Sequence, residues 1–418
     1  MILLVLARCA NLLGEKSEGS RSAALIMVPF RTEKRSRGTE AAAGVSAQME
    51  EYTLGVEEEY QVIDRETRGL SRNGESVLRR ARQILGEDRV VPEMWVSQIE
   101  ALTPICRTLA EIRAELLRLR RGVIEAAAGE GTRIVAASTH PFSHWQEQRI
   151  SPGERYRGVM EREQQLAEEQ VVFGFHVHIG LDDREAAVEV MNRARVWLAP
   201  LLALSANSPF WLGEDTGYAS YRTQLWGRLP TAGPPGPFSS LAEHDALVRA
   251  LVATGGAAEP TQLYWDMRLP EKWKTVEIRT ADVCSKVDEA VMLAGLSRGL
   301  VRACRERAER GEPYPETRPE LLRAAHWVAS RHGLDADLVD IEAGRARPAR
   351  EVIENLLTFA RPALEEHGDW EEVSTLVRDT LEQGNGASRQ RRVYERAGRL
   401  EDVVDMLIEE TARGTDST

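Results

Sequence analysis

Cysteine is scarce in this 418-residue chain, and its positions form no ligand pattern. The four cysteines are Cys9, Cys106, Cys284 and Cys304, and none stands in CxxC or CxH spacing. Zinc sites need such spacing, and disulfide-stapled domains need a denser cysteine framework. The sequence therefore indicates neither class and favours reduced thiols in a cytoplasmic protein.

An excess of positive charge is also lacking, because the formal net charge is −12. An acidic surface disfavours nucleic acid or an anionic membrane as partner. The N-terminal segment MILLVLARCANLL holds an apolar run of about seven residues, whereas a membrane span needs roughly twenty. The following stretch is rich in Ser, Gly, Ala, Arg and Lys without periodicity. We predict that residues 1–48 are a disordered extension or a mis-assigned start, with Met49 as the hypothetical biological start.

From Tyr52 onward, strand and helix patterns alternate without long linkers or repeats, which predicts a single catalytic domain over residues 49–418. We expect strands at 53–63, 90–104, 132–138, 171–181, 262–269 and 275–283. We expect helices at 109–123, at 184–206 with a kink at Pro200, at 240–254 and at 288–310. Only helical patterns follow residue 318, which predicts a helical C-terminal portion over about 318–412.

Three of the expected strands carry charged or ligating residues at alternate positions. Glu57 and Glu59 stand in LGVEEEYQV, and His176 and His178 in FGFHVHIGL. Alternate residues of a strand share one face of the sheet. A solvated charged face is the alternative for the glutamates, and hydrogen-bonded core histidines are the alternative for the imidazoles.

The third segment, YWDMRLPEKWKTVEIRTADV, predicts a hairpin. Asp266 and Arg268 alternate on its first strand, and Glu277 and Arg279 on its second. A cross-strand salt bridge is one interpretation. The apolar setting favours the other, in which the arginines bind phosphate or carboxylate bidentately.

Two further features extend the candidate site. Glu93 and Glu100 lie in PEMWVSQIEALTP, where a buried carboxylate needs a cation or a donor, although a surface position for Glu93 stays open. Residues 213–237 form a long segment rich in Gly and Pro, which is either a surface excursion or a substrate lid with Arg222 as an anion contact. Carboxylates, imidazoles and arginines gathered on one sheet face outline a site for magnesium and a nucleotide.

Taken in order, GVEEEY, VSQIEALTPIC, THPF, FGFHVHIGL, ANSPFWLGEDTGYASYRTQLW, YWDMRL and TVEIRTADV resemble the bacterial carboxylate–amine ligases of the glutamate–cysteine ligase type 2 family. The resemblance spans residues 52–310 motif by motif. It implies an α+β fold similar to the glutamine synthetase catalytic domain, in which a curved, mainly antiparallel sheet forms an active-site funnel with helices outside.

The implied reaction is ATP-dependent formation of an amide or γ-glutamyl bond through an acyl phosphate, with ADP and phosphate released. Mg²⁺ and ATP are the implied cofactors, and a carboxylic acid such as glutamate and an amine such as cysteine are the implied partners. A homodimer is a further hypothesis. The implied metal ligands are Glu57, Glu59, Glu93, Glu100, His176 and Glu277. Catalysis is implied for Arg279, Arg268 and Glu277, and ATP binding for Arg222, Arg268, Arg279 and His178.

Two other classes stay open. A metal-dependent hydrolase of the amidohydrolase type would need further strand-end histidines, but those after His178 all lie in helical patterns. A catalytically silent binding relative would keep the site without the reaction.

Overall fold

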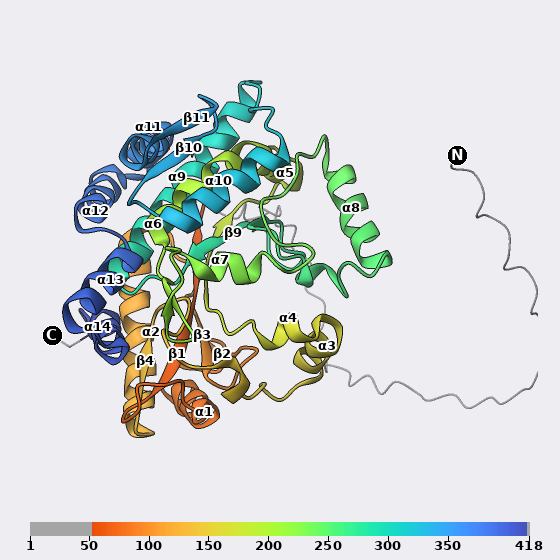
Figure 1. Ribbon diagram of the computed structural model, residues 1–418. Coiled ribbons are helices and arrows are strands. Elements are labelled where there is room, and N and C mark those ends of the chain that lie inside the picture. The colour runs from red at the N-terminus through yellow and green to blue at the C-terminus, as the bar shows by residue number, and fades with distance from the viewer. Residues whose placement is uncertain (1–51, 416–418) are drawn as a thin grey trace, which may run out of the picture. The chain divides into compact units, whose positions relative to one another are not determined.

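One antiparallel sheet organises the chain. The computed structural model describes residues 52–415, and the predicted N-terminal extension lies outside them. The strand order is β2-β3-β1-β5-β9-β8 (Figure 1). Strand β4 pairs with residues 61–64 of β1, at the end of β1 that follows its pairing with β3. Every pair that builds this sheet is antiparallel. The strands are β1 (Leu54–Asp64), β2 (Val90–Pro92), β3 (Gln98–Leu102), β4 (Thr132–Val135), β5 (Gly174–Gly180), β8 (Met267–Arg268) and β9 (Thr275–Asp282).

Helices from both halves of the chain complete the mixed α and β architecture, so the predicted α+β class is confirmed. The first half contributes α1 (Gly74–Leu85), α2 (Leu109–Gly129), α3 (Glu154–Glu163), α4 (Gln165–Glu168), α5 (Arg184–Ala194) and α6 (Leu198–Ser205). The second half contributes α7 (Tyr221–Trp226), α8 (Leu241–Ala253), α9 (Val287–Glu309), α10 (Pro319–His332), α11 (Ala349–His367), α12 (Trp370–Gln383), α13 (Gly386–Ala397) and α14 (Leu400–Ala412). Helices α11 to α14 gather on one side of the sheet in Figure 1.

Glu58 lies on the core face of the sheet, and its side chain points away from those of its neighbours in sequence. Arg120 of α2 donates to this carboxylate from Nε and Nη2, at 3.1 and 2.6 Å, and the Tyr60 hydroxyl donates to it at 2.5 Å. Arg120 and Glu58 are almost fully buried, and a buried charge is tolerated only when it is paired in this way. Alternation therefore leaves Glu57 and Glu59 for the opposite face, as the sequence predicts.

Two expected elements are each divided in the structure. The expected strand 90–104 is a hairpin of β2 and β3, because the chain turns between Pro92 and Gln98. The expected helix 184–206 is α5 and α6 joined by a 3₁₀ turn over Arg195–Trp197. Pro200 lies in the first turn of α6, where its missing N–H costs nothing, so the break precedes the proline.

The C-terminal portion is not purely helical, contrary to the prediction. A hairpin of β10 (Asp337–Asp340) and β11 (Arg345–Pro348) interrupts it between α10 and α11. Gly344, with φ of 63°, lies in the turn and adopts the left-handed conformation that glycine accepts at little cost. In the part of the chain that the structure describes, no helix has the length and apolar character needed to span a membrane.

A buried imidazole makes the stability of this fold depend on pH. His140 of the THPF motif accepts hydrogen bonds at Nδ1 from the amides of Phe142 and Ser143, and its Nε2 lies 2.8 Å from the Arg68 carbonyl oxygen. These partners fit the neutral ring, and burial lowers the pKa of His140 to about 4. Since the unfolded chain binds this proton near pH 6.5, the stabilisation is complete above that pH and is lost as the pH falls towards 4.

We therefore expect His140→Asn, which keeps an acceptor near the two amides, to show a shallower loss of stability between pH 6.5 and 4. The difference should reach roughly 3 kcal/mol across this window. Urea unfolding of both proteins at several pH values measures it, and parallel curves would contradict the assignment.

Candidate active site

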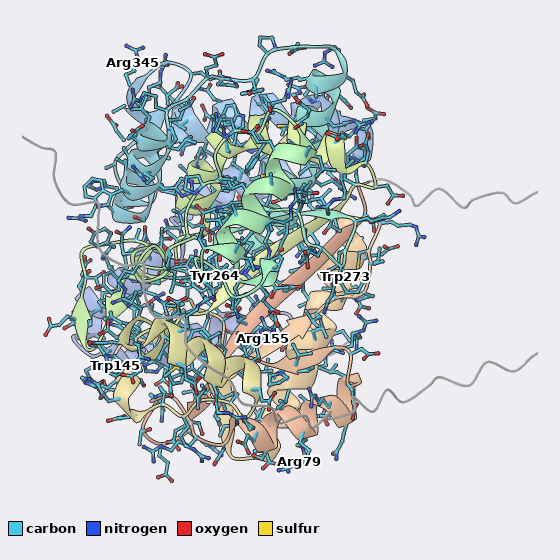
Figure 2. All side chains as sticks on the ribbon, turned by 90° about the vertical axis from the view of Figure 1, so that its right-hand side faces the viewer. Arg79, Trp145, Arg155, Tyr264, Trp273 and Arg345 are labelled. Carbon is cyan, nitrogen blue, oxygen red and sulfur yellow. The ribbon has the colours of Figure 1, made fainter. Side chains whose placement is uncertain are left out.

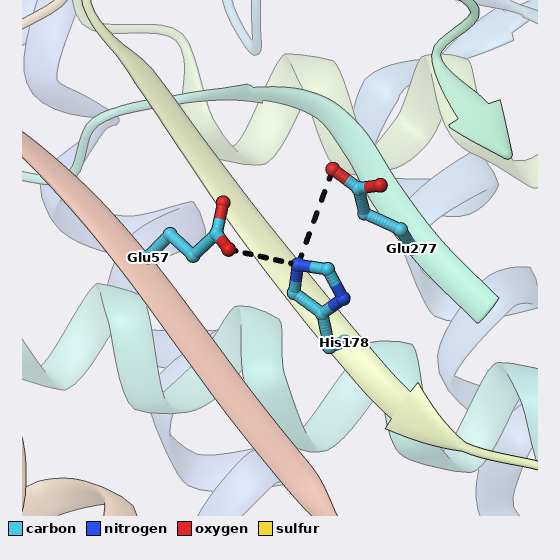
Figure 3. A group of neighbouring side chains, drawn as sticks. All are labelled: Glu57, His178 and Glu277. Carbon is cyan, nitrogen blue, oxygen red and sulfur yellow. Dashed lines mark hydrogen bonds and ion pairs between the residues drawn. The ribbon is translucent and has the colours of Figure 1, made fainter. Parts of the chain in front are cut away.

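The candidate residues form rows across neighbouring strands. Glu59 pairs with Glu100 between β1 and β3, Glu57 pairs with His176 between β1 and β5, and His178 pairs with Glu277 between β5 and β9. Arg268 of β8 then pairs with Glu277. Directly opposed residues on neighbouring strands point to the same face, so the register alone brings these side chains together. Figure 3 shows Glu57, His178 and Glu277 meeting over three adjacent strands.

These rows face a cavity of about 310 Å³. Predicted site residues that line it are Glu57, Glu59, Glu93, Glu100, His176, Arg222, Arg268 and Arg279. Glu277 and His178 do not line the cavity but contact residues that do. Glu277 is only 1% exposed and pairs with Arg268 and Arg279, and His178 pairs with Glu57.

Glu57 joins two groups of side chains with the spacing of metal ligands. One group is Glu57, His178 and Glu277, and the other is Glu57, Glu100 and His176. In each, one ligand atom per residue lies within 4.8 Å of the others. Glu57 Oε2 lies 2.9 Å from His176 Nδ1, and its Oε1 lies 3.1 Å from His178 Nε2. Glu59 and Glu93 belong to neither group.

The glutamates on this face differ in pKa, because burial and neighbouring charges affect each of them differently. Burial opposes ionisation of Glu57, but hydrogen bonds and charge from His176 and His178 hold its pKa well below the usual range. Burial and then the charge of Glu57 raise the pKa of Glu100 well above it. Burial and Glu93 raise the pKa of Glu59 to about 8, and burial raises that of Glu93. Without added positive charge, these crowded carboxyl groups cannot all be ionised together.

Arg268 and Arg279 surround Glu277, which also belongs to one of the two ligand groups. Arg268 donates to Glu277 from Nε at 2.5 Å, and Arg279 donates to the same carboxylate from Nη1. The cross-strand salt bridge is thus present. This salt bridge does not use all the donors of Arg279, because the buried Nε of Arg279 is without a hydrogen-bond partner among the described residues. Burial opposes the charge of Glu277, but Arg279 and then Arg268 hold its pKa well below normal.

A β-bulge brings a further carboxylate to this side of the sheet. β5 and β9 pair with a register shift, so that His178 lies opposite Glu277 while Gly174 lies opposite Asp282. The extra residue on β9 turns Asp282 to the same face as Glu277, against simple alternation. Asp282 is fully buried and accepts hydrogen bonds from the Asn207 amide and the hydroxyls of Ser208 and Ser220.

The segment 213–237 forms part of the cavity wall, since its helix α7 carries Arg222 and Trp226 there. The amides of Ala219 and Ser220 donate to the Ser330 carbonyl of α10, at 2.8 and 2.9 Å. The predicted lid is therefore anchored to the helical C-terminal portion at the start of α7. Arg222 is 4% exposed, and its Nη1 lies 3.9 Å from Asp282.

The cavity also has lining residues that the sequence analysis did not identify. Helix α3 supplies Arg155 and Tyr156, and its polar pattern resembles any surface helix. Tyr264 also lines the cavity, and it shares the alternation of Arg268, which could have revealed it. Figure 2 labels Arg155 and Tyr264 near one another on the side that faces the viewer. Asp266, expected beside Arg268, instead faces His326 of α10, whose Nδ1 lies 3.3 Å away.

The chain as a whole matches a known protein family. Residues 53–406 match the model of the glutamate-cysteine ligase family 2. The chain belongs to this family. The protein named "Putative glutamate--cysteine ligase 2" from Rhodopirellula baltica is 40% identical over 363 residues, which are 86% of this chain and 96% of that protein. "Putative glutamate--cysteine ligase 2-2" from Frankia alni is 41% identical over 372 residues, covering 86% and 97%.

Solved structures show that this family member shares its fold with more distant ligases. The glutamate–cysteine ligase of Francisella tularensis in complex with AMP aligns with a TM-score of 0.64 at 11% identity, over 87% of this chain and 90% of that one. A bifunctional glutathione synthetase from Pasteurella multocida aligns with a TM-score of 0.63 at 16% identity, over 87% and 52%. At these identities the likeness establishes the fold alone.

Proposed function

We propose that the protein is an ATP-dependent carboxylate–amine ligase that joins glutamate to cysteine or a similar amine. The observation that carries this proposal is that one cavity is lined both by carboxylates with a histidine and by arginines. The carboxylates and the imidazole suit divalent cations, and the arginines suit phosphoryl and carboxylate oxygens. Family membership supports the ligase class, and the AMP bound to the Francisella tularensis ligase supports a nucleotide.

The donor set fits Mg²⁺. Both ligand groups centre on Glu57 and add Glu100 or Glu277, and carboxylate oxygens are the ligands that this hard cation prefers. His176 and His178 hydrogen-bond to Glu57, and they either hold its orientation or add a ligand atom. Bound magnesium would neutralise the phosphates that enter and the glutamates that crowd the face.

The chain's own residues then position the reactants. A carboxylate is a poor electrophile, so the acid attacks the γ-phosphorus of ATP, which forms an acyl phosphate and releases ADP. Arg279 and Arg268 hold oxygens of the transferred group, and Arg222 contacts a further anion from the wall. The amine attacks the acyl carbon, phosphate leaves, and the arginines stabilise the negative charge that develops. We place the reaction in the cytoplasm, where thiols such as the buried free cysteines Cys106, Cys284 and Cys304 stay reduced.

We expect ATP to stabilise the protein only together with Mg²⁺. At a hundredfold excess over Kd, a ligand that binds only the folded state adds about 2.7 kcal/mol, which raises Tm by several degrees. Thermal melts with ATP, with and without magnesium, measure this effect. Glu57→Gln removes the carboxylate common to both ligand groups and should abolish the magnesium-dependent part. Equal shifts with and without metal would count against the proposal.

The reaction itself is tested by adding acids and amines in pairs with Mg-ATP and detecting phosphate together with the product mass. A ligase releases phosphate only when both substrates are present and yields their condensed product. Nucleotide-independent hydrolysis would instead identify the hydrolase class. Nucleotide binding without turnover would identify a silent relative.

A further inference from the structure

Arg155 of α3 is a cation of the cavity wall that the protein itself does not pair. In the described part of the chain, the cavity is lined by four arginines, which are Arg155, Arg222, Arg268 and Arg279. Arg268 and Arg279 donate to Glu277. Arg222 donates to the Arg279 carbonyl oxygen, at 3.4 Å. Arg155 alone of the four makes no hydrogen bond or ion pair with a described residue, and it is exposed. Its donors are therefore accessible to a ligand in the cavity.

Tyr156 holds this guanidinium beside the acidic part of the cavity. The Tyr156 hydroxyl donates to the Pro92 carbonyl oxygen at 2.9 Å, and Glu93 directly follows Pro92 in the chain. The Arg155 guanidinium lies 5.9 Å from the centroid of the Tyr156 ring. Burial raises the pKa of Glu93, and the charge of Arg155 opposes this rise more than any other group does. Arg155 therefore lies near Glu93, although the two form no ion pair.

The ligand that suits this place is an anion that binds together with a cation. Glu93 shares the cavity with Glu57, Glu59 and Glu100, so an anion without a cation would be repelled there. Mg²⁺ removes that repulsion, and it binds carboxylates together with the phosphates of a substrate. A guanidinium fits phosphate oxygens in a bidentate geometry. The phosphates of a magnesium nucleotide therefore suit both the glutamates and Arg155.

We propose that Arg155 binds phosphate oxygens of the magnesium nucleotide. Without ligand its charge offsets that of Glu93, and bound Mg²⁺ takes over this role and leaves the guanidinium to the phosphates. The inference rests on the proposed function and adds a residue that contacts the nucleotide. The other cavity arginines come from β8, β9 and α7, so α3 becomes a further segment that holds the nucleotide.

Calorimetric titration of the full chain with Mg²⁺ and a non-hydrolysable ATP analogue tests the contact. Arg155→Gln should bind the analogue at least about tenfold more weakly than the wild type, which is the factor that one charge-assisted hydrogen bond contributes. The loss should persist when Mg²⁺ is raised to saturation, because the contact is made to phosphate. Wild-type affinity in Arg155→Gln would overturn the proposal. A loss that disappears at saturating Mg²⁺ would assign Arg155 to metal binding and overturn it as well.

Arg157 supplies the matched control on the same helix. It is exposed and does not line the cavity, so Arg157→Gln removes the same charge without removing the contact. We expect this variant to bind the analogue as the wild type does. Equal losses in both glutamine variants would show a general effect of positive charge and overturn the proposal. Arg155→Lys should recover only part of the affinity, because lysine keeps the charge but not the fork of two donors.

Misfolding can be separated from loss of the contact. Arg155 has no hydrogen-bond or ion-pair partner in the described part of the chain, so the unliganded Tm of Arg155→Gln should match that of the wild type. The titrations contain no acid substrate. A guanidinium that serves only the carboxylate of the acid would therefore leave the affinity for the analogue unchanged, and this result would overturn the nucleotide contact.

The two proposals fail separately. Phosphate release by Arg155→Gln at the wild-type rate, with the wild-type KM for ATP, would leave the ligase function standing and remove the contact. The expected binding pattern without phosphate release from any acid and amine would keep the contact and remove the ligase function.

Discussion

Glu277→Gln is expected to lower turnover by at least about a hundredfold while the protein still folds. Glu277 is buried between Arg268 and Arg279 and belongs to one of the two candidate metal groups. The amide keeps the shape but removes the charge that fixes both guanidiniums and would hold a cation. Loss of one preorganised electrostatic group costs about 10² to 10³ in rate. Steady-state kinetics with Mg-ATP, once the substrates are known, measures it.

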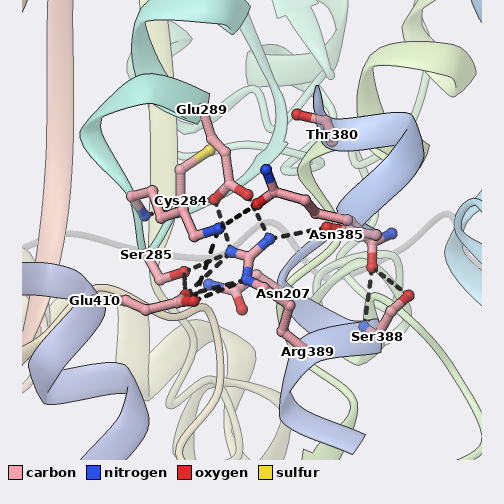
Figure 4. A network of polar contacts seen from close by, with 12 residues as sticks. Asn207, Cys284, Ser285, Glu289, Thr380, Asn385, Ser388, Arg389 and Glu410 are labelled. Atoms are coloured by element: carbon pink, nitrogen blue, oxygen red, sulfur yellow. Dashed lines mark hydrogen bonds and ion pairs between the residues drawn. The ribbon is translucent and has the colours of Figure 1, made fainter. Parts of the chain in front are cut away.

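A matched control separates catalysis from stability. Glu289 is a buried glutamate of α9 that accepts from Arg389 Nη1 and Nη2 at 2.6 and 3.0 Å, in a network with Glu410 and Ser285 (Figure 4). It does not line the cavity. Glu289→Gln should lose about 2 kcal/mol of stability, because a hydrogen bond to a charged group contributes about that much. The variant should keep its turnover. If both variants lose stability and neither loses turnover, Glu277 is structural.

The sheet and its polar face are predictable because alternation is a local property. Each of β1, β5 and β9 carries its own pattern of apolar and charged residues, so Glu57, His176 and Glu277 can be assigned to one face before the strands are paired. The antiparallel register then makes them neighbours. The Glu58–Arg120 pair confirms the same logic on the opposite face.

Features that depend on contacts between distant segments could not be predicted. The bulge in β9 that turns Asp282 towards the cavity depends on its pairing with β5, which no local pattern encodes. Asp266 does not line the cavity although Arg268 does, because its carboxylate lies against His326 of α10, at 3.3 Å, which is a contact between distant segments. Arg155 reaches the cavity only because α3 packs over it.

Arg279→Lys is expected to lower turnover by roughly a hundredfold although the charge is conserved. The guanidinium of Arg279 donates to Glu277 from Nη1, and Arg279 also lines the cavity, so it can bind Glu277 and a phosphoryl oxygen together. Lysine offers one point charge on a flexible stem and cannot reproduce this fork. The loss should therefore come from geometry.

Arg120→Lys is the matched control, because Arg120 binds a glutamate on the opposite face of the same sheet. Its guanidinium also donates to the carbonyls of Ser285 and Cys284, at 2.6 and 2.7 Å, so lysine there should cost stability without touching the cavity. Kinetics and urea unfolding of both variants distinguish the roles. If Arg279 served only the cross-strand pair with Glu277, then Arg279→Lys would behave like Arg120→Lys, with turnover retained and stability reduced.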